Sequence, residues 1–102
     1  MIKALIVDDQ SLFLDSLELF LRQDDSIEVI GTATNGTDAL AMIRVCEPDV
    51  LLLDLRMPAL SGLDAARMVR MEFPRIKIII LTTFDDDSDI LQTLVLGCEA
   101  YI

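Results

Sequence analysis

Short runs of apolar residues alternate along this chain with longer segments in which apolar residues recur at helical spacing. Three of the short runs, 4–7, 50–53 and 78–81, show no polar alternation, which is typical of strands buried on both faces of a parallel sheet. The longer segments have the apolar pattern of helices that pack against such a sheet. The pattern predicts strands at Lys3–Val7, Ile27–Thr32, Val50–Asp54, Ile76–Thr82 and Glu99–Ile102, and helices at Ser11–Arg22, Thr37–Cys46, Leu63–Met71 and from Asp85–Ser88 to about Leu96.

Turn-forming residues separate these elements. Asn35-Gly36 follows the second strand, and Pro48 ends the second helix because the residue before a proline is pushed out of the helical region. The helix Ser11–Arg22 is apolar around much of its girth, so we expect it to be pressed on the sheet. The alternation predicts one doubly wound α/β domain. No helix follows the last strand, so one edge or face of the sheet is expected to lack its cover.

Three of the apolar runs end in side chains suited to binding a metal ion or a phosphate. Asp8-Asp9 follows the first run, Asp54 ends the third, and Thr82-Thr83 closes the fourth. Ligands of doubly wound sheets bind just outside the carboxyl ends of the strands. If these three strands are neighbours, three carboxylates and a hydroxyl therefore converge on one small pocket.

These residues favour a magnesium-assisted phosphoryl site. A carboxylate such as Asp54 at a buried strand end is costly unless it is paired or coordinated, and oxygen-only ligation suits Mg²⁺. A carboxylate beside Mg²⁺ can attack a phosphoryl group, and the Thr82 hydroxyl can donate a hydrogen bond to it. Taken singly, Asp8 and Asp9 have the simpler interpretation of a helix N-cap and a solvated neighbour, and Thr82 that of a β-branched strand residue.

Composition narrows the function further. The 102 residues carry 18 acidic and 8 basic side chains, a net charge of −10, which argues against direct nucleic-acid binding. No apolar stretch approaches the roughly 20 residues of a membrane span, and there is no signal-peptide pattern. The absence of histidine excludes histidine-based nucleophile and acid–base systems. Cys46 and Cys98 are isolated, so we expect two reduced core thiols in a cytosolic protein and no zinc site.

The combined motifs resemble the receiver domain of bacterial two-component response regulators over the whole chain. The resemblance rests on Asp8-Asp9, on Asp54 within the segment Leu51–Pro58, and on Gly62, Thr82-Thr83 and Tyr101. The segment Leu81–Asp87 is similar to receivers whose output module is a LuxR-type helix-turn-helix DNA-binding domain. The family implies a flavodoxin-like five-stranded parallel sheet in the order 2-1-3-4-5, cytoplasmic location, and a signalling phosphoacceptor rather than an enzyme.

The resemblance also assigns roles to individual residues. Asp54 resembles the phosphoacceptor, which receives its phosphoryl group from a sensor histidine kinase. Asp8 and Asp9 resemble the acidic pair that holds Mg²⁺, with Asp54 and the backbone carbonyl of Arg56 as further ligands. Three more positions complete the expected site: the switch hydroxyl Thr82, the small residue Thr83 beside the phosphoryl group, and the switch aromatic Tyr101.

The chain departs from the receiver pattern at its end. Receivers carry a lysine shortly after the switch aromatic and a fifth helix beyond it, whereas this sequence stops at Ile102. Lys3 and Lys77 stand at strand starts, the wrong end of the sheet, so neither replaces that lysine. We therefore expect residues 1–102 to be a C-terminally truncated receiver without its output domain. DNA contacts would then belong to that missing domain, and uncovered apolar surface would favour self-association.

Three other interpretations remain. A haloacid-dehalogenase-type phosphatase also uses an Asp nucleophile with Mg²⁺, but it needs a second Asp two positions later, where this chain has Arg56. A dinucleotide-binding half-domain would need a GxGxxG turn where this chain has Asp8–Ser11. A receiver fold that dimerises or docks without phosphorylation is the most serious alternative. The residues that follow Ile102 in the parent gene, a Lys before Asp or Pro, would discriminate it.

Overall fold

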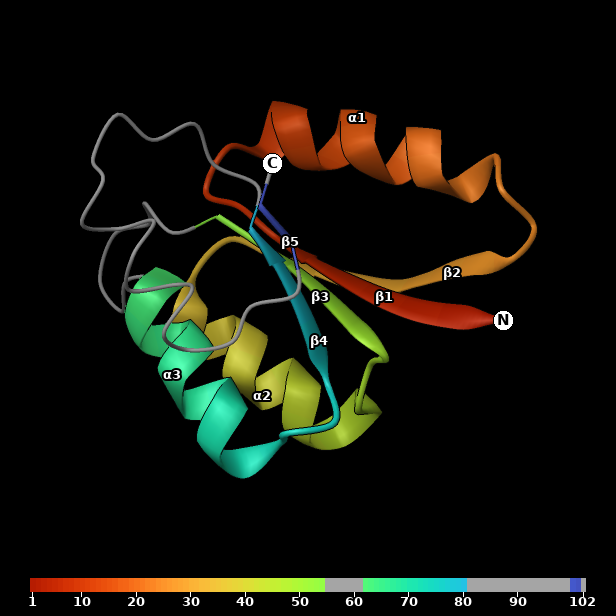
Figure 1. Ribbon diagram of the computed structural model, residues 1–102. Helices are drawn as coiled ribbons and strands as arrows, with labels where there is room; N and C mark the ends of the chain where they lie inside the picture. Colours follow the sequence, from red (N-terminus) through yellow and green to blue (C-terminus); the bar gives the residue numbers. More distant parts are fainter. Residues whose placement is uncertain (55–61, 81–99, 102) are drawn as a thin grey trace.

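The computed structural model describes residues 1–54, 62–80 and 100–101, which form a parallel sheet between two layers of helices (Figure 1). The boundaries lie within two residues of those predicted, apart from β4 and β5, whose predicted ranges extend beyond the described residues. The elements are β1 (Ile2–Val7), α1 (Ser11–Arg22), β2 (Ile27–Ala33), α2 (Gly36–Cys46), β3 (Val50–Leu53), α3 (Gly62–Glu72), β4 (Lys77–Ile80) and β5 (Ala100–Tyr101).

The strands lie in the order β2-β1-β3-β4-β5, and every pairing between them is parallel. The α/β fold with a flavodoxin-like parallel sheet agrees with the sequence analysis. β5 is described for two residues only, which pair with Ile79 and Ile80 of β4. The predicted helix ending near Leu96 and the Gly97 region lie outside the described residues.

The helices divide between the two faces of the sheet. α1 covers one face, where Leu14 packs with Ile6 and Val29. α2 and α3 cover the other face, where a larger group of buried side chains forms the main core. The strands β1, β3 and β4 all contribute fully buried side chains to this core: Leu5, Leu51, Leu53, Ile78 and Ile80. Burial on both faces explains why the central strands β1, β3 and β4 contain uninterrupted apolar runs.

α1 is less deeply buried than its sequence predicted. Leu14 is its one buried residue, whereas Leu12, Leu19 and Phe20 are 83%, 68% and 69% exposed. The apolar residues of this helix therefore form one buried stripe and a separate set of exposed side chains. These side chains bear on the expected self-association, which stays a prediction.

α2 is delimited by the two signals seen in the sequence. The Asn35 side chain accepts a hydrogen bond of 2.8 Å from the Asp38 amide and so caps the first turn. At the other end Glu47, which precedes Pro48, adopts a left-handed conformation with φ 44°. The proline thus ends the helix as predicted, although Glu47 turns left-handed rather than extended.

The amino ends of the strands are tied together at Asp49. Its carboxylate accepts a 2.9 Å hydrogen bond from the Lys3 amide, and its carbonyl accepts one of 3.1 Å from the Lys77 amide. Both lysines therefore lie at the edge of the sheet opposite the strand ends that carry acids, as expected.

Two findings concern the predictions about cysteine and membranes. Cys46 is exposed at the end of α2, so the expectation of a core thiol is wrong at this position. Cys98 lies outside the described residues. Among the described helices, none is both long enough and apolar enough to cross a bilayer.

Candidate functional site

The backbone places two acidic residues next to each other where β1 and β3 end. Val7 pairs with Leu53, and the hydrogen bonding continues one residue beyond both strands. The Asp54 amide donates to the Val7 carbonyl at 2.9 Å, and the Asp8 amide donates to the Ala33 carbonyl of β2 at 3.1 Å. Asp8 and Asp54 therefore start from fixed backbone positions at the centre of the sheet.

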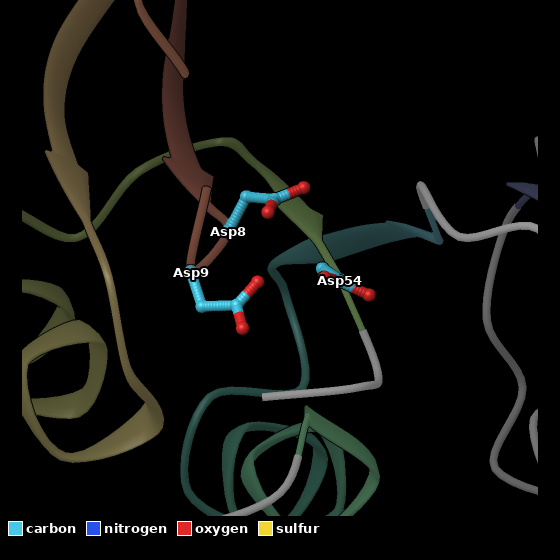
Figure 2. Close-up of side chains that lie close together, drawn as sticks. All are labelled: Asp8, Asp9 and Asp54. Atoms are coloured by element: carbon cyan, nitrogen blue, oxygen red, sulfur yellow. The ribbon is translucent and has the colours of Figure 1, made fainter. Parts of the chain in front are cut away.

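Asp8, Asp9 and Asp54 come together at this edge, as the sequence predicted. Figure 2 shows the three side chains gathered beside the ends of β1 and β3. Each can offer a carboxylate oxygen that lies within 4.8 Å of those of the other two. Asp8 and Asp54 are only 6% and 8% exposed, whereas Asp9 is open to solvent.

The cluster is electrostatically unfavourable without a cation. Burial raises the pKa of the Asp8 carboxyl above its ordinary value, and the neighbouring carboxylates of Asp54 and Asp9 raise this pKa further. The Gln10 amide donates a 2.9 Å hydrogen bond to Asp8 Oδ1 and partly offsets these effects. A divalent cation among the three carboxylates would relieve the repulsion.

The donor set fits magnesium. All three groups are carboxylates, hard oxygen ligands that Mg²⁺ and Ca²⁺ prefer, and the sequence offers no histidine. Mg²⁺ is usually bound by one or two carboxylates and keeps several waters. Exposed Asp9 beside two buried acids provides both the protein ligands and the access for such waters.

The other predicted site residues lie largely outside the part of the chain that the structure describes. Arg56, Thr82 and Thr83 lie outside the described residues. Tyr101 is described as a backbone position in β5, paired with Ile80. The neighbouring register Leu53↔Ile80 brings the end of β4 beside the end of β3.

Two residues that contact Asp8 were not predicted from the sequence. Gln10 supplies an amide to the Asp8 carboxylate, and Ala33 supplies the carbonyl that receives the Asp8 amide. Both act through their backbones, so their side chains carry no signal of the role. The N-cap residue of α1 is Gln10 rather than Asp8 or Asp9, and the Asp8 carboxylate accepts the hydrogen bond of the Gln10 amide.

Comparison with known families decides what kind of domain carries this site. The family model described as the response regulator receiver domain matches residues 4–102. The chain belongs to this family. A receiver domain of two-component response regulators is therefore the setting of the acidic cluster, as the sequence motifs implied.

Curated relatives agree with this assignment. The transcriptional regulatory protein LnrK of Bacillus subtilis is 35% identical over 102 residues, which are all of this chain and 46% of LnrK. The response regulator protein VraR of Staphylococcus aureus is 33% identical over 101 residues, 99% of this chain and 48% of VraR. The chain thus spans about half the length of these relatives, and its homologues include transcription regulators.

Solved structures show the same receiver fold. A DNA-binding response regulator of the LuxR family from Staphylococcus aureus superposes with a TM-score of 0.94 at 27% identity, covering 100% of this chain and 85% of that one. The receiver domain of the putative response regulator NarL from Mycobacterium tuberculosis gives 0.90 at 30% identity, covering 98% and 81%.

Proposed function

We propose that this receiver is a phosphoacceptor, which takes a phosphoryl group from a sensor histidine kinase onto Asp54. The observation that carries the proposal is the meeting of Asp8, Asp9 and Asp54 within 4.8 Å at the carboxyl edge of the sheet in a chain of this family. In this role the domain is a signalling module rather than an enzyme.

In this proposal Asp54 acts as the nucleophile. A carboxylate oxygen of Asp54 forms a bond to phosphorus while the bond from phosphorus to the kinase imidazole nitrogen breaks, and its electron pair leaves with that nitrogen. The hydrogen bond from the Asp54 amide to the Val7 carbonyl would hold the Asp54 backbone during the transfer. Fixed geometry matters because phosphoryl transfer depends mainly on in-line positioning and charge stabilisation.

Asp8 and Asp9 would hold Mg²⁺ together with Asp54 and the carbonyl of Arg56. Bound there, Mg²⁺ supplies positive charge that offsets the negative charge on the phosphoryl oxygens. Buried Asp8 orients its carboxylate through the Gln10 amide, and exposed Asp9 leaves room for water ligands.

The switch residues form the second part of the proposal. Thr82 would donate its hydroxyl to a phosphoryl oxygen, Thr83 would leave space for that group, and Tyr101 would change rotamer with Thr82. The pairings of β4 with β3 and of β5 with β4 support this order of residues along the edge. As part of the same proposal, a full fifth strand completes the sheet.

The signal would pass to a transcriptional output domain. LnrK is a transcriptional regulatory protein and one structural relative is a DNA-binding response regulator, while this chain spans about half of LnrK. The net charge of −10 supports DNA contacts through that separate domain rather than through residues 1–102. We place the domain in the cytoplasm, where the kinase would reach it.

Beryllofluoride, a mimic of the phosphoryl group, tests the acceptor. With Mg²⁺ it should give a bound fluorine NMR signal and raise the melting temperature of the wild type, and Asp54→Asn should show neither change. Asp9→Asn should require a severalfold higher Mg²⁺ concentration for the same effect.

Asp25→Asn is the matched control, since Asp25 is an exposed acid in the α1–β2 turn, away from the cluster. It should behave like the wild type. Mg²⁺-dependent beryllofluoride binding that persists in Asp54→Asn would contradict the proposed acceptor.

A further inference from the structure

β2 contains one residue more than its partner strand. Ala4 pairs with Val29, but the next residue, Leu5, pairs with Gly31, so Ile30 has no partner in β1. Such a β-bulge shifts the register of everything that follows it in the strand. From Gly31 onward the pairing is regular again and ends at Val7↔Ala33.

The bulge puts two consecutive residues, Ile30 and Gly31, on the face of the sheet that α2 covers. Val29 packs on the α1 side with Ile6, and Ile30 packs against the core on the opposite side. A Cβ atom at Gly31 would lie 2.2 Å from Met42 Cε and 3.6 Å from Leu5 Cδ1, so this position also faces α2. Without a side chain at Gly31, the methyl end of Met42 closes over the bulge.

The shifted register reaches the acidic cluster. It sets Ala33 opposite Val7, with the small Ala33 side chain in the core and its carbonyl receiving the Asp8 amide at 3.1 Å. In an unshifted register Thr32 would stand opposite Val7 and turn its hydroxyl into the apolar core, which is costly without a hydrogen-bond partner. The packing of α2 over the bulge and the backbone position of Asp8 are thus linked through β2.

We propose that Gly31 is a positioning residue for the metal site. By leaving room for Met42, it keeps the bulge of β2 in place, and the bulge holds the Ala33 carbonyl against the Asp8 amide. Outer contacts of this kind orient metal ligands and affect metal affinity although they touch no metal. The link to metal affinity rests on the proposed function, whereas the link to the Asp8 backbone does not.

The test enlarges Gly31 and then restores the space. Gly31→Val should weaken the NMR scalar coupling across the hydrogen bond from the Asp8 amide to the Ala33 carbonyl, and should raise the dissociation constant for Mg²⁺ about tenfold. Gly31→Val combined with Met42→Ala should recover most of both, because the smaller residue at position 42 admits the new side chain. Gly31→Ala adds only the Cβ atom, and the flexible methyl end of Met42 can move aside for it, so both quantities should change in the same direction by much less.

Val69→Ala is the control, since Val69 is a buried α3 residue of the same core. It should lower the melting temperature and leave both the coupling and the Mg²⁺ affinity unchanged. All measurements are made at a temperature where every variant is folded by circular dichroism. If Gly31→Val does not fold, Gly31→Ala and its combination with Met42→Ala decide the question.

Two results would overturn the inference: an unchanged Asp8–Ala33 coupling in the folded Gly31 variants, or an equal loss in Val69→Ala. Failure of Met42→Ala to restore the coupling would overturn the role of the Met42 contact. A wild type that binds no Mg²⁺ would instead contradict the proposed function, and the coupling would still decide whether Gly31 positions Asp8.

Discussion

At the residue scale, ionisation of the buried Asp8 carboxyl is electrostatically unfavourable. Its carboxyl is buried beside two other acids, and burial with these neighbours raises its pKa above the ordinary value of 3.8. A raised pKa in the folded state means that the folded domain binds this proton more tightly than the unfolded chain does. Ionised Asp8 therefore destabilises the metal-free domain.

The pH dependence follows from this sign. The protonated Asp8 carboxyl stabilises the folded domain. This stabilisation is fully present below pH 3.8 and is lost as the pH rises through the higher pKa of the folded state. Without metal, the free energy of unfolding of Asp8→Asn should therefore increase relative to that of the wild type as the pH rises through this window. Urea titrations at a series of pH values check it, and saturating Mg²⁺ should favour the wild type instead.

Asp25→Asn serves as the control for the pH series, because Asp25 is exposed in a turn and lies outside the cluster. Its stability difference from the wild type should not follow the Asp8→Asn curve. A stability difference between Asp8→Asn and the wild type that stays constant with pH would show that ionisation of Asp8 is not unfavourable in the folded domain.

The three acids could be predicted because Asp8-Asp9 and Asp54 directly follow apolar runs. A carboxylate at the end of a buried strand is costly unless it is paired or coordinated, which points to a role. Gln10 and Ala33 could not, because a backbone amide and a backbone carbonyl are common to every such residue. The roles of Arg56, Thr82, Thr83 and Tyr101 stay predictions.

At the scale of elements, strands were easier to predict than the details within them. Burial on both faces makes β1 and β3 continuous apolar runs, which no amphipathic helix would show. The bulge at Ile30 was not predicted, although Gly31 inside the strand IEVIGTA is the kind of residue that often marks one. The depth of burial of α1 was overestimated, since Leu19 and Phe20 are exposed although their residue types are common in cores.

The cap of α2 gives a prediction at this scale. The Asn35 side chain accepts from the Asp38 amide at 2.8 Å and donates to the Asp38 carboxylate at 3.0 Å. Asn35→Ala removes both bonds and should lower the free energy of unfolding by about 1 kcal/mol. Urea denaturation measures this loss. Thr34→Ala, at the exposed neighbouring position, should stay close to the wild type, and an equal loss there would contradict the capping role.

At the scale of the whole molecule, the parallel topology turns separate sequence signals into one site. The order β2-β1-β3-β4 sets the ends of β1 and β3 side by side, which brings Asp54 to a pair of acids 46 and 45 positions earlier in the chain. Lys77 is the first residue of β4 and Lys3 the second residue of β1, so both lie at the opposite ends of these strands. The parallel arrangement was predictable because short apolar strands alternate with helices, whereas the strand order was implied by the resemblance to receiver domains.

The most direct measurement is the intact mass of the protein after incubation with acetyl phosphate. The wild type with Mg²⁺ should gain the mass of one phosphoryl group, and the gain should disappear when Mg²⁺ is chelated. Asp54→Asn should gain nothing, while Asp25→Asn should match the wild type. A phosphoryl gain in Asp54→Asn, or a wild type that stays unmodified with Mg²⁺ present, would contradict the account of Asp54 as the acceptor.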